Sequence, residues 1–328
     1  MKVLLTGGTG FVGINIAEKL LDEGIDVVIY GLHSLPEEVE RAFQKSRGTH
    51  VFVQGDILDQ NLLDSTIKKY NLTAVIHGAA ITPDVEREIK DGRTIVNVNC
   101  MGTVEVLEAA RKNNIEKFIH LSTQAVYGRT ALENDILIED SSNLKPEELY
   151  DITKFAAERI AIRYKQLLDM NIVVARMGDI FGPWEYYSGV RDVMSAPFQV
   201  SQLAISAKKA LLPRSGYKRW VYSRDIATSL FALLKSDSLK HDVYNVSSRH
   251  YWSVEEWCKL LEEKYPSFSY EIVKNPEEAN VTFRPDFAPL QIDRLVEDTQ
   301  YVPPFDLKKS FEDYNEWLEK NSIFLSAK

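Results

Sequence analysis

Cysteines and long apolar runs are scarce in this sequence. The chain has 328 residues but only two cysteines, Cys100 and Cys258, and neither has a histidine or cysteine neighbour at ligand spacing. The sequence therefore predicts neither a disulfide framework nor a metal site. The longest apolar stretches fall far short of the about 20 residues that a membrane-spanning helix requires. Because the first residues already read as a strand, we expect a cytoplasmic protein without a signal peptide or membrane anchor.

Positive charge is also in deficit. Lysine and arginine total 39 against 48 aspartates and glutamates, which gives a formal net charge of −9. Binding to a phosphate backbone requires clustered basic side chains, and no basic stripe is visible along the chain. We therefore expect no nucleic-acid partner. With 45% apolar residues, the chain can bury a full core and is predicted to be an ordinary globular protein.

The first half of the chain alternates short β-branched runs with helical stretches. This pattern is typical of βαβ units and of a parallel sheet that is buried on both faces. Six strands are predicted, at Lys2 to Thr6, Asp26 to Tyr30, Val51 to Gln54, Ala74 to His77, Phe118 to Ser122 and Ile172 to Arg176. Helices are predicted at Val12 to Glu23, Asn99 to Asn113, Asp151 to Met170, Val254 to Glu263 and Leu307 to Glu319. The sequence therefore indicates an α/β fold.

The regular alternation stops after Arg176. The next segment is rich in glycine, proline and aromatic residues, and the remainder of the chain is mixed. Gly24 is expected to end the first helix in a left-handed conformation, and Ser253 with Glu256 predicts a capping box. We expect a first domain of residues 1–176, with a returning segment near residues 220–248, and a smaller α+β lobe over residues 177–328.

A glycine-rich turn follows the first predicted strand directly. Gly7, Gly10 and Gly13 stand three residues apart, and with Phe11 and Val12 between the last two they are the predicted cofactor-binding residues of this turn. A strand, a glycine turn and a helix at the start of a βαβ unit predict dinucleotide binding, because the bare backbone and the helix N-terminus can approach a pyrophosphate. The first domain is therefore predicted to be a Rossmann-type, doubly wound parallel sheet that binds NAD(P).

The end of the second strand leaves NAD and NADP as open alternatives. An acidic side chain here would bind the ribose hydroxyls of NAD, but the chain has Gly31, followed shortly by His33 and Ser34. Gly31 leaves room for a 2′-phosphate that His33 or Ser34 could contact, although no arginine stands nearby. After the third strand, Asp56 and its neighbour Ile57 are candidates for contact with the adenine. A role of Asp56 in a turn is an equal alternative.

A tyrosine and a lysine in the predicted helix 151–170 region are candidates for acid–base chemistry. Tyr150 and Lys154 are four residues apart and so share one helix face. A nearby ammonium stabilises a phenolate and lowers the pKa of the phenol from its ordinary value of about 10. The segment from His120 to Gly128 ends the fifth strand and supplies hydroxyl groups, at the edge of the sheet where ligands gather.

With these motifs in order, the chain resembles the extended short-chain dehydrogenase/reductase group, which contains the NAD-dependent sugar epimerases and dehydratases. The resemblance runs through most of the chain. Besides the glycine turn and Tyr150 with Lys154, it includes the segments Val75 to Ala80, Asn99 with Gly102 and Thr103, Arg176 to Pro183, Arg219 to Tyr222 with Asp225, Tyr244 to Val246, and Pro289 to Leu295.

The resemblance implies roles for particular residues. Tyr150 is expected to be the general acid/base, and Lys154 to hold the nicotinamide ribose and lower the pKa of the phenol. Thr123 corresponds to the catalytic Ser/Thr of the group and would bind the reacting oxygen, with Ser122 as a less favoured alternative. In the cofactor site, the resemblance places Ala79, Ala80 and Asn99. A structural role for His77 is favoured over a catalytic one.

Two departures from the group's pattern concern the substrate. Dehydratases of the group follow the catalytic hydroxyl with two acidic residues, whereas this chain has Gln124 and Ala125, which disfavours elimination. Asp179 stands where the group usually has an asparagine that helps to hold a sugar-linked diphosphate. Its carboxylate would repel a diphosphate unless cationic groups intervene. Arg191 and Arg284 lie among loop-forming residues, and with Asp179 and Thr123 they are the predicted substrate-binding residues.

Three functions from different classes are therefore considered. The leading prediction is an NAD(P)-dependent epimerase of a nucleotide-linked sugar. A dehydrogenase or reductase of a sugar acid, lactone or polyol is the second, and a non-catalytic dinucleotide-binding regulatory protein is the third. The predicted helices 99–113 and 151–170 carry apolar side chains beyond the needs of one sheet face, including Phe155, Ile160, Tyr164 and Leu167. In relatives the corresponding helices pair across a two-fold axis, so we expect a homodimer.

Overall fold

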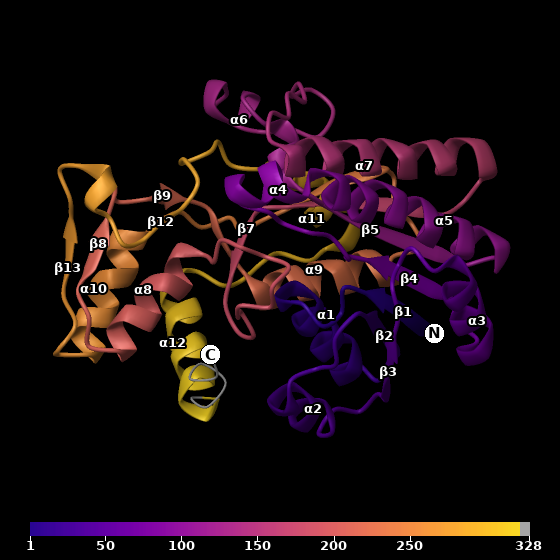
Figure 1. The fold of residues 1–328 in the computed structure, drawn as a ribbon, viewed down its shortest axis with the longest axis horizontal. Coiled ribbons are helices and arrows are strands. Elements are labelled where there is room, and N and C mark those ends of the chain that lie inside the picture. The colour runs from indigo at the N-terminus through magenta and orange to yellow at the C-terminus, as the bar shows by residue number, and fades with distance from the viewer. Residues whose placement is uncertain (322–328) are drawn as a thin grey trace.

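The computed structural model describes residues 1–321 and is built around one parallel sheet (Figure 1). Seven strands lie in the order β11-β6-β5-β4-β1-β2-β3, and every neighbouring pair is parallel. Their bounds are β1 Lys2–Thr6, β2 Asp26–Gly31, β3 His50–Gln54, β4 Ala74–His77, β5 Lys117–Thr123, β6 Ile172–Met177 and β11 Val243–Val246. The six predicted strands are all present, with ends that agree to within one residue. The predicted doubly wound α/β fold is confirmed.

Helices cover both faces of the sheet, as Figure 1 shows. On one face, α1 (Phe11–Asp22) packs against α9 (Ser223–Lys235). On the other face, α5 (Gly102–Lys112) packs between α3 (Gln60–Tyr70) and α7 (Leu149–Leu168). Because both faces are covered, the central strands are almost wholly buried.

The predicted helix 99–113 begins earlier than expected. The helical segment starts with α4 (Val85–Val96), continues through η1 (Asn97–Met101) and ends with α5. The Asp84 side chain caps it by accepting a hydrogen bond from the Arg87 N–H. This start was missed although α4 is amphipathic, and of its residues only Ile95 is buried. Gly24 has a positive φ of 75°, and the Ser253–Glu256 capping box is present, so both of those predictions are confirmed.

The remaining elements form a smaller group of strands and helices beside the sheet, on the left in Figure 1. They are α8 Ala196–Ile205, β8 Ala210–Leu212, β9 Tyr217–Lys218, β12 Trp252–Ser253, α10 Val254–Lys264, β13 Tyr270–Ile272 and α12 Leu307–Lys320. The short pair β7 (Asp179–Phe181) and β10 (Trp220–Tyr222) connects this group to the sheet. Stacked and edge-on contacts among Phe181, Trp252 and Trp257 fill its interior.

Smaller elements complete the described chain. They are α2 Glu37–Phe43, η2 Gln124–Tyr127, α6 Thr130–Glu133, η3 Pro276–Glu278 and α11 Asp293–Thr299. Within residues 1–321, none of the helices combines the length and the apolar character that a bilayer-spanning segment needs. The same residues contain no group of three or more His, Cys, Asp or Glu side chains that could hold a metal ion. The strand order brings the segments that follow β1, β4, β5 and β6 to one edge of the sheet, where ligands bind in folds of this kind.

Candidate active site

The glycine turn after β1 is shaped by close backbone contacts. Gly7 has a φ of 71°, and a Cβ on it would lie 2.7 Å from the Ala79 nitrogen. A Cβ on Gly13 would lie 2.2 Å from the Gly7 carbonyl oxygen. The fold itself therefore requires these two glycines. A Cβ on Gly10 would approach nothing closer than 3.4 Å, and no side chain caps the N-terminus of α1 at Gly10. The turn can thus accept a phosphate at the start of α1.

The other residues predicted for the adenine end follow β2 and β3. His33 and Ser34 follow β2 and are exposed, so both can be reached by a ligand. The exposed Asp56 accepts a hydrogen bond from the Leu58 N–H at 3.0 Å, which supports the turn role that the sequence left open. Ile57 is buried. Contacts of these residues with a cofactor stay predictions.

The Asn99 side chain forms hydrogen bonds within the protein. It is fully buried, and its Oδ1 accepts from the Ile81 N–H at 2.8 Å. Its Nδ2 donates to the Ile81 carbonyl at 3.1 Å and to the Thr153 hydroxyl at 3.0 Å. Asn99 therefore ties the segment that contains Ala79 and Ala80 to α7. Its predicted contact with the cofactor stays a prediction.

His77 links three elements at the end of β4. Its Nδ1 lies 2.7 Å from the Thr6 hydroxyl, and its Nε2 lies 3.0 Å from the Thr103 hydroxyl. Burial, with a smaller effect of Lys154, lowers the pKa of His77 to about 3, so the ring is neutral. Both ring nitrogens are occupied within the protein, which supports the structural role favoured from the sequence.

A cavity of about 270 Å³ brings the predicted catalytic and substrate residues together. Its wall includes Thr123, Tyr150, Asp179, Arg191 and Arg284, together with Val12 from the first turn of α1. These residues come from segments that are more than 250 positions apart at the extremes of the chain. The glycine-turn helix, the phenol and both predicted arginines therefore border one space.

Tyr150 projects into this cavity near Thr123. Burial raises the pKa of the Tyr150 phenol above its ordinary value, while the Arg284 charge and hydrogen bonding with the Thr82 and Thr123 side chains act to lower it. The cation with the largest lowering effect is thus Arg284, whereas the sequence predicted Lys154 for this role. Ser122 also lines the cavity, but its hydroxyl donates to Glu158 Oε2 at 2.8 Å. The geometry favours Thr123 over Ser122 as the partner of the reacting oxygen.

Lys154 lies below the cavity wall and is only 4% exposed. Burial lowers the pKa of its ammonium to about 8, and the nearby Glu158 carboxylate opposes this shift. A buried lysine one helical turn after Tyr150 fits the predicted contact with a ribose. This contact stays a prediction.

The Asp179 carboxylate forms an ion pair with a lysine that the sequence did not single out. The Lys218 ammonium donates to Asp179 Oδ2 at 2.7 Å, and Lys218 is almost fully buried. Burial by itself would raise the pKa of Asp179, but Lys218, Arg284 and hydrogen bonding with Gln124 outweigh it and lower the pKa. The cation needed to offset Asp179 is therefore present. Lys218 adjoins the family-like segment 219–222, but no spacing marked it as special.

The two predicted arginines are already paired with carboxylates. Arg191 lies 3.3 Å from Glu185, and its guanidinium lies 5.6 Å from the centre of the Phe11 ring. Arg284 pairs with Glu148 and, at 3.4 Å, with Asp151 on α7. An anionic substrate group must compete with these carboxylates for either arginine.

The segment between β7 and α8 crosses from the glycine turn to the loop after β4. The Tyr186 hydroxyl donates to the Thr9 carbonyl at 2.7 Å. Further along, the Thr82 N–H donates to the Val190 carbonyl at 2.9 Å, and Arg87 pairs with Asp192 at 3.2 Å. The segment therefore covers the side of the site at which Arg191 meets Phe11.

Comparisons with known proteins agree with this geometry. The NAD dependent epimerase/dehydratase family matches residues 3–247. A putative UDP-glucose 4-epimerase of Methanocaldococcus jannaschii is 26% identical, over 98% of this chain and 99% of the relative. The low-salt glycan biosynthesis protein Agl12 of Haloferax volcanii is 29% identical, over 76% of this chain and 77% of the relative.

A solved structure supports the fold. UDP-glucuronic acid 4-epimerase from Bacillus cereus, in complex with NAD, has a TM-score of 0.78 with 23% identity and covers 98% of this chain and 99% of its own. The family match spans nearly the whole sheet and includes Thr123 and Tyr150, and the resemblance stated from the sequence is confirmed. The chain belongs to the NAD-dependent epimerase/dehydratase family of enzymes.

Proposed function

We propose that this enzyme epimerises a nucleotide-linked sugar with NAD as its bound cofactor. One observation carries the proposal: Tyr150, Thr123 and the first turn of α1 border a single cavity. The family match and the relatives described as UDP-sugar epimerases support the substrate class. NAD is favoured over NADP because no arginine follows β2, where the exposed residues are His33 and Ser34.

The residues of the cavity suffice for the proton transfers. When bound, the dinucleotide supplies a reversible hydride acceptor. Tyr150 Oη takes the proton from a sugar hydroxyl as the C–H hydrogen leaves as hydride, and Thr123 Oγ1 donates a hydrogen bond to the same oxygen. After the sugar has presented its other face, the hydride would return to the same carbon while Tyr150 returns the proton to the carbonyl oxygen. Lys154 would hold the cofactor ribose, and the Arg284 charge would stabilise the phenolate.

Dehydration, the other reaction in the family name, fits the site less well. The residues after Thr123 are Gln124 and the buried Ala125, so no carboxyl group follows the catalytic hydroxyl. Gln124 instead hydrogen-bonds Asp179. Elimination needs a general acid for the departing oxygen, and an amide cannot supply that proton.

Cofactor turnover distinguishes the epimerase from the dehydrogenase alternative. An epimerase regenerates its dinucleotide in each cycle, so we expect product from UDP-sugars with at most one equivalent of NADH per active site at 340 nm. The dinucleotide that copurifies with the protein should be NAD by mass spectrometry. Steady accumulation of reduced cofactor with a sugar acid or lactone would instead establish the dehydrogenase. Titration with NADP in parallel tests the cofactor preference.

Two further proposals rest on the sequence. We propose a cytoplasmic location, and a division of labour in which residues 1–176 and the returning segment 220–248 bind the dinucleotide while most of residues 177–328 bind the substrate. The second proposal is supported by β11 lying in the main sheet and by Asp179, Arg191 and Arg284 lining the cavity from the later part of the chain.

We also propose a homodimer, formed through α4, η1 and α7. Ile160 and Tyr164, which the sequence suggested for this face, are partly buried against the core. The exposed apolar side chains of these helices include Val85, Ile89 and Met101, and on α7 Ile152 and Leu167, the last of which the sequence also suggested. Ile89 is 84% exposed, an unusual state for such a large apolar side chain unless a partner covers it.

Replacing Ile89 by aspartate should therefore dissociate the dimer. Light scattering should give twice the 37.4 kDa chain mass for the wild type and about the single mass for Ile89→Asp at micromolar concentration. Val302→Asp introduces the same charge at an exposed apolar residue outside these helices and should leave the mass unchanged. A wild-type monomer under these conditions would refute the dimer.

A further inference from the structure

Glu158 occupies a position that the catalytic scheme leaves unused. It lies on α7, four residues after Lys154 and eight after Tyr150, so the three side chains share one helix face. Glu158 is completely buried, as is the side chain that pairs with it, Arg176. Arg176 donates to both of its oxygens, through Nε at 3.0 Å and through a terminal nitrogen at 2.5 Å.

The same carboxylate also binds the strand that carries Thr123. The Ser122 hydroxyl donates to Glu158 Oε2 at 2.8 Å. Since Thr123 is the next residue along β5, this bond fixes the strand end against the catalytic helix. The three hydrogen bonds to Glu158 therefore come from β5 and β6, and they hold α7 against both strands.

Glu158 also dominates the electrostatic surroundings of Lys154. The other titratable groups within electrostatic reach of Lys154 are Cys100 on η1, His77 on β4 and His120 on β5. Burial lowers the pKa of both histidines far below the ordinary value and raises the pKa of the Cys100 thiol. These three groups are therefore neutral near pH 7. Among these groups, Glu158 has the largest electrostatic effect on Lys154.

We propose that Glu158 is a positioning residue for the proton transfer at Tyr150. Its hydrogen bond with Ser122 aligns Thr123 with the catalytic helix, and its charge keeps Lys154 in the ammonium form. The proposal rests on the proposed function, because it assumes that Lys154 binds the cofactor ribose. An ammonium makes stronger hydrogen bonds to ribose hydroxyls than a neutral amine does.

The affinity for NADH as a function of pH tests this proposal. NADH fluorescence titrations of the full chain, freed of endogenous dinucleotide, should show wild-type affinity falling as the pH rises past the pKa of Lys154, which is about 8. Without the Glu158 charge, Lys154 loses its proton more readily. The midpoint for Glu158→Gln should therefore move toward acid by about one pH unit. Because Glu158→Gln leaves Arg176 buried without its partner, the double variant Glu158→Leu with Arg176→Met provides a second test with an apolar pair. It should move the midpoint in the same direction.

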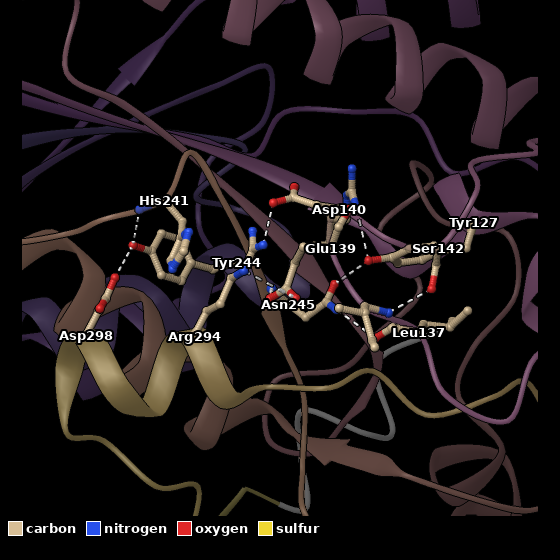
Figure 2. Close-up of polar contacts among 12 residues, drawn as sticks. Tyr127, Leu137, Glu139, Asp140, Ser142, His241, Tyr244, Asn245, Arg294 and Asp298 are labelled. Carbon is tan, nitrogen blue, oxygen red and sulfur yellow. Dashed lines mark hydrogen bonds and ion pairs between the residues drawn. The ribbon is translucent and has the colours of Figure 1, made fainter.

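Glu139 provides a matched control within the same polar network. Arg176 donates to the Tyr127 hydroxyl at 2.9 Å, Tyr127 donates to Asn245 Oδ1 at 2.9 Å, and the Asn245 N–H donates to Glu139 at 2.9 Å. Figure 2 shows Tyr127, Asn245 and Glu139 close together, near Arg294. Glu139 is 4% exposed, so Glu139→Gln makes the same chemical change in a buried site that does not act on Lys154.

The control variant should keep the wild-type midpoint even if its melting temperature falls. If both Glu158 variants bind NADH with the wild-type midpoint, or with a more alkaline one, the positioning role is refuted and the proposed function stands. If the wild type binds no NADH at any pH, the proposed function and this inference fall together.

Discussion

Replacing Tyr150 by phenylalanine is expected to lower kcat by a factor of about 10²–10⁴, the usual contribution of a positioned acid/base. The phenol borders the cavity and hydrogen-bonds with Thr82 and Thr123, so removing one oxygen deletes the proton acceptor and leaves the cavity shape intact. Affinity for the dinucleotide should change little, because the glycine turn and Lys154 are untouched. Steady-state assays with a UDP-sugar and a binding titration with NAD measure the two effects separately.

Tyr164→Phe is a matched control on the same helix. The Tyr164 hydroxyl donates to Glu108 at 2.8 Å, away from the cavity. This variant should lose a partly exposed hydrogen bond but keep its activity. Full activity of Tyr150→Phe would mean that another group transfers the proton and that Tyr150 has been misassigned.

The second large effect is expected at the glycine turn. The Cβ of Gly13→Ala would lie 2.2 Å from the Gly7 carbonyl oxygen and 2.6 Å from Gly8 Cα, and backbone atoms cannot move aside as a side chain could. Overpacking of this kind costs about 1–3 kcal/mol or more, because the first turn of α1 must shift away from β1. Thermal unfolding should show a clear loss of stability, and NAD binding should be abolished, because the amides of the turn no longer converge on the phosphates.

Gly10→Ala separates binding from folding in the same turn. Its Cβ would meet nothing closer than 3.4 Å, so the melting temperature should stay near that of the wild type. The added methyl group would occupy the side from which a pyrophosphate approaches, and we expect NAD to bind at least about tenfold more weakly, a change of about 1.4 kcal/mol. If Gly10→Ala binds NAD normally while Gly13→Ala is destabilised, the turn is a purely structural feature.

The sequence predicted some parts of the site better than others. Spacing marked Gly7, Gly10, Gly13 and Tyr150, because their predicted roles depend on neighbours along the chain, and the family resemblance marked Thr123. It did not mark Lys218, whose importance comes from Asp179, 39 positions away. Nor did the sequence reveal that the Asn99 side chain would form hydrogen bonds with the Ile81 backbone. Contacts of this kind leave no periodic signal.

The sequence also did not predict which charged groups would act on Tyr150 and Asp179. The pattern suggested that Lys154 lowers the pKa of Tyr150, yet in the fold Arg284 has the largest lowering effect, although it stands 134 positions later. The repulsion expected from Asp179 is offset by a lysine that approaches from β9. Both outcomes depend on distances and burial, which local sequence does not specify.

By itself, the sequence determined the parallel sheet, the glycine turn and the family, and it pointed to Tyr150 and Lys154 as the candidate catalytic pair. Local patterns suffice for these features, because apolar periodicity and glycine placement act over a few residues. Only the tertiary structure decided which charges offset one another, which hydroxyl faces Tyr150, and that a buried Glu158 joins two strands to the catalytic helix. Electrostatic energies fall with distance through a medium whose polarity depends on burial, so they are set when distant segments pack together.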